Sequence, residues 1–176
     1  MADVVVIMGP TGAGKTVQGE RLAAQLGYAH FSTGRLLRAD PAAVAILQKG
    51  QLAPTDEVQR VLNVAMANVP QAKGVVLDGF PRTVEQAEWL DGRLADWSRR
   101  LQAVLEIQID EATAAKRLAS RGRSDDTAEA QARKRRQYHA VMAPVADYYA
   151  ARGQLHVIDG RGTIEDVEEQ IRTALS

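Results

Sequence analysis

A glycine-rich segment near the start of the chain has the composition of a phosphate-binding loop. Residues 9–16, Gly-Pro-Thr-Gly-Ala-Gly-Lys-Thr, follow the apolar run 4–8 and match the spacing G-x-x-x-x-G-K-[ST]. The glycines let successive backbone N–H groups face one concavity, and the positive end of a following helix adds to their attraction for phosphate. Lys15 can reach the β- and γ-phosphates, and the Thr16 hydroxyl is a natural ligand for the Mg²⁺ that the phosphates carry. The sequence therefore predicts a loop that binds a polyphosphate together with Mg²⁺.

A second polar group follows another apolar run. Residues 78–82, Asp-Gly-Phe-Pro-Arg, come directly after the run 75–77. Ligands of open α/β sheets bind at the carboxyl edge of the strands, so we expect Asp78 and Arg82 to lie beside the phosphate loop. A purely structural ion pair between these two side chains is the alternative, because ion-pair networks also gather at loop edges.

The elements that must position these groups alternate along the whole chain. Strands are expected at 4–8, 75–77, 104–109 and 155–158, with a weaker one at 29–31, and helices at about 14–26, 55–68, 83–94, 111–120, 126–151 and 163–175. This alternation predicts an α/β doubly wound parallel sheet with right-handed crossovers. Two stretches interrupt it, a helical one at about 35–69 and a polar one at 121–127, and inserts of this kind can act as mobile lids.

The composition excludes several classes of protein. A chain of 176 residues is expected to form one domain, and the absence of Cys excludes disulfides and thiolate metal sites. Because 22 basic residues balance 22 acidic ones, we expect neither nucleic acid nor an anionic membrane as a partner. No apolar run approaches the ~18–20 residues of a membrane span, and Asp3 without a basic segment makes a poor signal peptide. We therefore expect a soluble cytoplasmic protein.

Taken together, the motifs resemble those of the adenylate kinases and, more broadly, the nucleoside monophosphate kinases. The resemblance covers nearly the whole chain; the matching segments are the phosphate loop, Ser32-Thr33-Gly34 with Arg38, residues 50–54, residues 78–83 with Gln86-Ala87, residues 117–126 and residues 138–149. It implies one P-loop NTPase-like domain over 1–176: a parallel five-stranded sheet with helices on both faces, a helical acceptor-binding insert at about 32–69 and a very short lid at about 121–127. It also implies a monomer that reversibly transfers a phosphoryl group from ATP·Mg²⁺ to AMP, giving two ADP.

The same resemblance assigns roles to individual residues. ATP is expected to contact Gly12, Ala13, Gly14, Lys15, Thr16, Arg117 and Arg123, and AMP to contact Thr33, Arg38, Gly79, Arg82 and Gln86. The expected catalytic residues are Lys15, Arg82, Arg121, Arg123 and Lys134, with Thr16 and Asp78 at the Mg²⁺, Asp78 through water. Arginine suits such roles because its planar guanidinium binds phosphate oxygens in bidentate fashion. The i,i+4 spacing of Arg117 and Arg121 places both on one helix face.

The choice of acceptor rests on Thr33 and Gln86. These residues match the adenylate kinase pattern, whereas the related pyrimidine monophosphate kinases tend to carry Ala and an Asn-rich segment there. A Gln amide offers one donor and one acceptor to an adenine edge, which favours AMP. The alternatives are a Gln86 that only caps its helix, a UMP/CMP-type or other nucleoside monophosphate kinase, and a P-loop nucleotide-binding module with little transfer activity.

Some positions depart from the family pattern. Thr16-Val17 replaces the usual Gly-Thr, Arg35 replaces the Asp that usually follows Ser-Thr-Gly, and Lys134 occupies the place of a catalytic Arg. Arg35 either tightens phosphate binding or disturbs Mg²⁺ placement. The segment between Arg38 and Gln48 is also shorter than usual. Two groups of residues are expected to have no role in the chemistry: His30, His139 and His156, which have neither metal-ligand spacing nor an obvious carboxylate partner, and Tyr138, Tyr148 and Tyr149, which have the helical spacing of core residues.

Overall fold

The computed structural model describes residues 1–47, 54–71, 73–119 and 128–176. Its five strands are β1 (Ala2–Met8), β2 (Ala29–Ser32), β3 (Val75–Asp78), β4 (Arg99–Gln108) and β5 (Leu155–Asp159). They form one sheet in the order β2-β3-β1-β4-β5, and every pairing is parallel. The predicted α/β fold with a parallel five-stranded sheet is confirmed.

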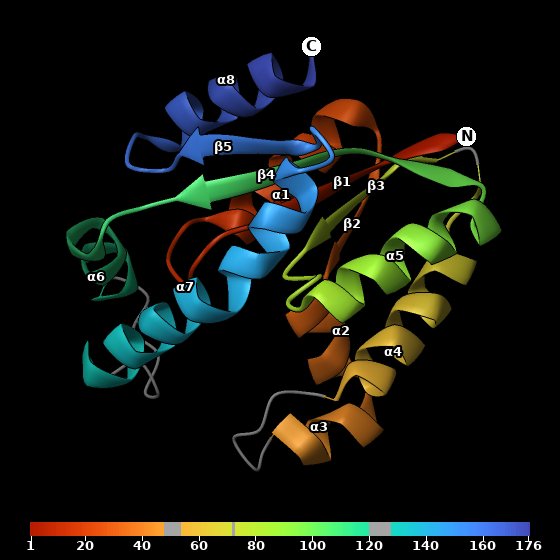
Figure 1. Ribbon diagram of the computed structural model, residues 1–176, viewed down its shortest axis with the longest axis horizontal. Coiled ribbons are helices and arrows are strands. Elements are labelled where there is room, and N and C mark those ends of the chain that lie inside the picture. The colour runs from red at the N-terminus through yellow and green to blue at the C-terminus, as the bar shows by residue number, and fades with distance from the viewer. Residues whose placement is uncertain (48–53, 72, 120–127) are drawn as a thin grey trace.

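Helices cover both faces of this sheet (Figure 1). α1 (Lys15–Leu26) and α8 (Ile164–Leu175) pack on one face, while α4 (Thr55–Ala67), α5 (Val84–Asp96) and α7 (Ala128–Ala150) pack on the other. The remaining helices, α2 (Thr33–Ala39), α3 (Pro41–Leu47) and α6 (Glu111–Ala119), follow β2 and β4. The predicted helical stretch at about 35–69 holds α2, α3 and α4 and, in its described part, no strand.

The central strand β1 shows why the sheet is buried on both sides. Val4 and Val6 contribute to the core beneath α4, α5 and α7, while Val5 and Ile7 contribute to the core beneath α1 and α8. All four side chains are fully buried. A run of β-branched residues without polar alternation is what a strand between two helical layers requires.

The prediction for the start of β4 is wrong. The strand begins at Arg99, five residues before the apolar run at 104–109, because its first residues are polar. Ala2 and Asp3 of β1 pair with Arg99 and Arg100. The Arg99 side chain is buried and donates hydrogen bonds to backbone carbonyls of Pro70 and Lys73. A polar side chain such as that of Arg99 can occupy a buried strand position where an apolar residue is expected, provided that it is hydrogen-bonded.

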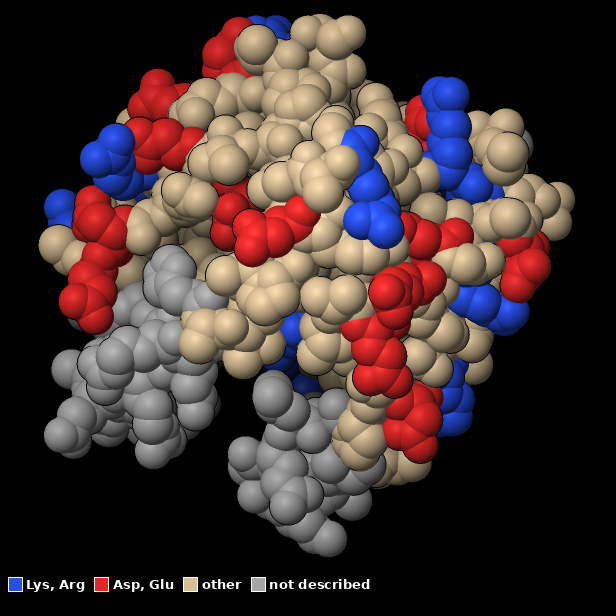
Figure 2. All heavy atoms as spheres, viewed as in Figure 1, with Lys and Arg blue, Asp and Glu red and all other residues tan. Residues whose placement is uncertain are grey.

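Side chains of both charges occur on the surface that Figure 2 shows. Acidic side chains form a nearly continuous stretch toward the lower right of this face, with basic side chains beside it. Basic atoms are visible in the depth of the hollow at its lower edge (Figure 2). Among the described residues, no helix combines the length and the apolar character needed to cross a membrane.

Candidate functional site

The phosphate loop connects the end of β1 to α1. Gly9 lies so close to β4 that a Cβ atom there would stand 2.6 Å from the backbone oxygen of Ile107, so only glycine fits. Gly14, which precedes α1, has a φ of 90°, a left-handed conformation that glycine adopts without strain. Lys15 folds back over the loop, and its Nζ donates to the carbonyl of Pro10 at 3.0 Å. The first turn of α1 holds no acidic residue, so nothing there competes with an anion for the helix N-terminus.

The Asp78 carboxylate lies directly beside this loop. β3 pairs with β1, and Ile7 stands opposite Asp78 in the register, so both strands end at the same edge. Asp78 is 3% exposed, and its Oδ2 accepts a hydrogen bond of 2.6 Å from the Thr16 hydroxyl. A charge-assisted bond of this length fixes both side chains where the phosphate loop and β3 meet.

His30 also lies beside Asp78, which corrects the expectation that it lacks a carboxylate partner. Its Nε2 is 3.9 Å from Asp78 Oδ2 because β2 and β3 are neighbours in the sheet. Burial lowers the pKa of His30, although Asp78 and Glu20 oppose that shift. The imidazole is therefore neutral at pH 7. The strand order, which the sequence alone does not give, creates this contact.

Arg82 lies at the same edge of the sheet. Its Nε donates to the carbonyl of Gly79 at 2.9 Å, which turns the guanidinium back over the loop after β3. Burial lowers the pKa of Arg82 and the Asp78 charge raises it, yet the side chain stays exposed to solvent. The Arg82 guanidinium is thus a cation that lies in a hollow and still contacts solvent. Among the described residues no ion pair joins Asp78 to Arg82 directly, so the geometry does not favour a purely structural ion pair.

Gln86 is buried against the loop that carries Arg82. Its Oε1 accepts from the backbone N–H of Arg82 at 2.8 Å, and its Nε2 donates to Thr55 Oγ1 at 3.3 Å. The backbone N–H of Gln86 donates to Thr83 Oγ1, so Thr83 caps α5. Gln86 is thus part of a network that joins the loop after β3 to α5 and α4, and Thr55 is a member that the sequence did not indicate.

The predicted acceptor residues of α2 also lie at this edge, because Ser32 pairs with Asp78 immediately before the helix. Thr33 is 3% exposed, and its hydroxyl has no hydrogen-bond partner among the described residues. Arg38 folds back along the helix, since a Cβ atom on Gly34 would lie 3.3 Å from its Nη1. Arg35 instead pairs with Glu20 of α1 at 2.6 Å, with both side chains exposed.

The donor side of the site is described only in part. Arg117 of α6 donates to the carbonyl of Gly162 at 2.8 Å, and a Cβ atom on Gly12 would lie 3.3 Å from the Ala114 oxygen, so α6 packs against the phosphate loop. Arg121 and Arg123, with the predicted lid, lie outside the described residues. Lys134 belongs to α7, but its side chain is also outside the described part of the structure.

Tyr138 has a place in the site that its helical spacing did not predict. Its ring packs against the core, as expected. Burial and the Glu106 charge raise the pKa of Tyr138, while Arg82 and a backbone hydrogen bond from Gly9 oppose the rise. The phenol therefore lies near both Gly9 of the phosphate loop and Arg82, and it remains protonated at neutral pH.

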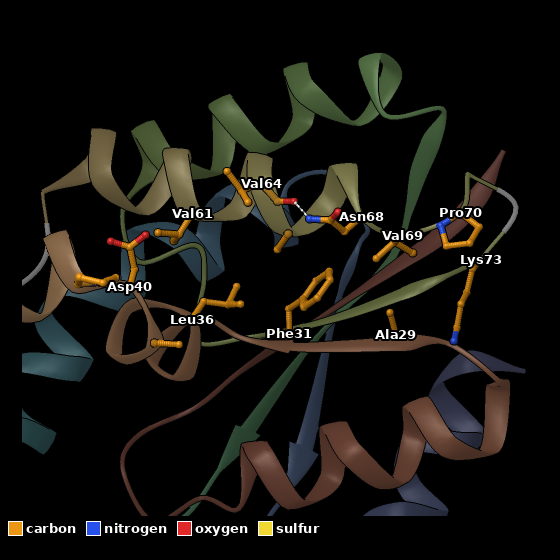
Figure 3. Close-up of a pocket in the computed structure, with 13 residues that line it drawn as sticks. Ala29, Phe31, Leu36, Asp40, Val61, Val64, Asn68, Val69, Pro70 and Lys73 are labelled. Atoms are coloured by element: carbon orange, nitrogen blue, oxygen red, sulfur yellow. Dashed lines mark hydrogen bonds between the residues drawn. The ribbon is translucent and has the colours of Figure 1, made fainter.

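A pocket beside the edge strand β2 is separate from the predicted site residues. Figure 3 shows it between α4 and β2, with Asp40 toward one end and Lys73 at the other. Its volume is about 570 Å³, and none of the predicted ATP, AMP or catalytic residues lines it. Asp40 is already paired with Arg60 at 2.8 Å. The pocket is thus distinct from the edge at which the phosphate loop and Asp78 meet.

The oxygen atoms at that edge suit Mg²⁺, which prefers hydroxyl, carboxylate and phosphate ligands. Thr16 and Asp78 supply a hydroxyl and a carboxylate 2.6 Å apart. No group of three or more His, Cys, Asp or Glu residues that could hold a metal occurs among the residues described. The donor set therefore fits an ion that arrives with phosphate oxygens of its own.

The comparisons with known proteins agree with this arrangement. A sequence model of the family described as Adenylate kinase matches residues 7–154. The chain is 38% identical to an adenylate kinase from Stenotrophomonas maltophilia (strain R551-3), over 97% of this chain and 98% of that protein. It is 39% identical to an adenylate kinase from Synechococcus sp. (strain RCC307) over the full length of both, and 37% identical to one from Nocardia farcinica (strain IFM 10152) over 97% and 98%. The chain therefore belongs to the adenylate kinase family and is a phosphotransferase of the nucleoside monophosphate kinase type.

Proposed function

We propose that this chain transfers the γ-phosphoryl group of ATP·Mg²⁺ directly to AMP and thereby forms two molecules of ADP. Phosphoryl transfer requires little covalent chemistry from the protein, so positioning and charge stabilisation account for catalysis. We also propose that one domain over 1–176, acting as a monomer, holds both nucleotides, with the insert at about 32–69 on the acceptor side and the lid at 121–127 on the donor side.

On the donor side, the loop amides of Gly12, Ala13 and Gly14 bind the phosphates of ATP. Lys15 exchanges its bond to the Pro10 carbonyl for the β- and γ-phosphates, an exchange that its position above the loop supports. Thr16 and Asp78 hold the Mg²⁺, Asp78 through water. When bound, Mg²⁺ neutralises charge on the phosphate oxygens.

On the acceptor side, Arg38 and Arg82 hold the phosphate of AMP, with Thr33, Gly79 and Gln86 around its base and sugar. An arginine in a hollow that is still open to solvent keeps its charge and gains electrostatic strength from the reduced dielectric, which supports this role for Arg82. Arg117 packs on the adenine of ATP. Arg121, Arg123 and Lys134 neutralise the charge that spreads over the transferred phosphoryl group.

One observation carries the proposal. The 2.6 Å bond between Thr16 of the phosphate loop and Asp78 of β3 joins the expected donor site to the strand that leads into Gly79, Arg82 and Gln86. The groups that we propose for donor and acceptor follow strands that end at one edge of the sheet, which supports in-line transfer between two bound nucleotides.

The test is ADP formation by the purified protein from ATP·Mg²⁺ with each of AMP, CMP, UMP and GMP. ATP binding is measured on the same sample by calorimetry. We expect turnover with AMP at the highest kcat/KM. Preferred turnover of a pyrimidine monophosphate would show that the acceptor assignment is wrong. Tight ATP binding without any ADP formation would instead identify a nucleotide-binding module.

A further inference from the structure

We propose that Thr55 is a positioning residue that holds the Gln86 amide in the one orientation that reads adenine and rejects a purine with a carbonyl at position 6. The inference deepens the proposed function and rests on its assignment of Gln86 to the base of AMP. Thr55 itself is not expected to touch the phosphates or ATP.

The backbone of Arg82 sets which way the amide points. A backbone N–H can only donate, so the Gln86 atom that lies 2.8 Å from it must be the oxygen. The opposite orientation would place the amide NH₂ against this N–H, two donors facing each other in a buried site. Gln86 is 6% exposed, so water has little access to relieve such a clash.

Thr55 holds the other end of the same amide. Its hydroxyl oxygen lies 3.3 Å from Gln86 Nε2 and accepts one of the two N–H groups. Thr55 is the first residue of α4, whereas Gln86 lies in the first turn of α5. Figure 1 shows these helices side by side with their first turns at the same end, and a bond of 3.2 Å between Arg93 and Asn63 joins them further along. The amide is therefore anchored from two separate elements.

The remaining capacity of the amide matches adenine. An amide oxygen accepts two hydrogen bonds and an NH₂ donates two, and the Arg82 N–H and Thr55 use one of each. One acceptor site on the Gln86 oxygen and one N–H on the Gln86 nitrogen remain free for a ligand. Because the amide cannot flip, the positions of this acceptor and this donor are fixed. Adenine presents a donor at its 6-amino group and an acceptor at N1, which complement that order. Hypoxanthine presents an acceptor at its 6-carbonyl and a donor at N1–H, which oppose it at both positions.

AMP and IMP are therefore the matched pair of acceptors for the test, since they differ only at position 6 and N1. The rates of ADP formation from ATP·Mg²⁺ are measured with each acceptor for the wild type, Thr55→Val and Thr55→Ser. We expect the wild type to favour AMP by at least about 100-fold in kcat/KM. Loss of one amide anchor in Thr55→Val should raise the KM for AMP by about three- to tenfold and narrow the AMP/IMP ratio by a similar factor. Because ATP does not contact Thr55, the KM for ATP should stay unchanged.

Thr55→Ser keeps the hydroxyl and should restore the wild-type AMP/IMP ratio.

Thr173→Val is the matched control, because it also removes a threonine hydroxyl but lies on α8, away from the site. In the described structure the Thr173 Oγ1 bonds only Glu169 of the same helix. An unchanged AMP/IMP ratio in Thr55→Val, or equal losses in the Val and Ser variants, would overturn the inference. If Thr55→Val does not fold, Thr55→Ala removes the same hydroxyl and should narrow the AMP/IMP ratio in the same way, and an unchanged ratio in that variant overturns the inference. A wild type that phosphorylates none of these acceptors would instead overturn the proposed function itself.

Discussion

At the scale of single residues, the contact between Thr16 and Asp78 links the phosphate loop to β3. The hydroxyl stands directly after the loop lysine and donates to the carboxylate of Asp78 at 2.6 Å. The neighbouring Val17 is partly exposed and takes no part in this bond. Thr16 therefore supplies an oxygen atom at the position that phosphate-loop proteins use for Mg²⁺.

Thr16→Val removes this hydroxyl at nearly constant shape. We expect kcat/KM for ATP·Mg²⁺ to fall by about 10- to 100-fold and the Mg²⁺ concentration for half-maximal rate to rise, because an oxygen near the ion is lost. Steady-state rates over a magnesium titration measure both effects. Thr16→Ser keeps the oxygen and should recover most of the rate. A larger loss in Thr16→Ser than in Thr16→Val would contradict this expectation and show that the methyl group, and hence packing, is what matters at this position.

At the scale of elements, the sequence predicts every strand and most helix limits, because long apolar or amphipathic runs determine them. It misses the start of β4, where Arg99 is buried through hydrogen bonds and not through apolar character. It also misses the contacts of His30 and Thr55, since both depend on which elements become neighbours. His30 meets Asp78 only because β2 pairs with β3, and Thr55 meets Gln86 only because α4 lies against α5.

The contact between α5 and α7 leads to a testable prediction at this scale. Asp91 of α5 accepts a hydrogen bond of 2.8 Å from the Tyr148 hydroxyl of α7, and its other oxygen is buried without a partner among the described residues. Burial raises the pKa of Asp91 above its usual value of 3.8, although the Tyr148 bond and Arg152 oppose the rise. The native state therefore binds this proton more readily than the unfolded state does. Stability is lost as the pH rises from about 3.8 through the native pKa.

Asp91→Asn cannot ionise and still accepts the Tyr148 hydrogen bond. We expect the difference in Tm between Asp91→Asn and the wild type to become more positive from about pH 4 to pH 7, as followed by circular dichroism. Asp96→Asn is the control, because Asp96 is 59% exposed in its pair with Arg93. A Tm difference that is independent of pH, or one that falls as the pH rises, would contradict the assigned direction of the shift.

At the scale of the whole molecule, one edge of the parallel sheet unites groups that are far apart in the sequence. The phosphate loop, the first turn of α2 and the loop after β3 all follow strands whose carboxyl ends meet there. The motifs predicted this convergence because parallel strands place their carboxyl ends together. The sequence did not supply the internal hydrogen bonds that orient Gln86 and Thr16, since these depend on side-chain packing between elements.

The central claim is that one phosphoryl group passes directly between two nucleotides bound at this edge. The most direct measurement is a single-turnover reaction of the purified chain with Mg²⁺, AMP and ATP that carries ³²P in its γ-phosphate. The label should appear in the β-phosphate of ADP formed from AMP, at a rate that depends on both nucleotides, with none released as inorganic phosphate. Label that appears as free phosphate, or ATP that stays intact when AMP is present, would contradict the account.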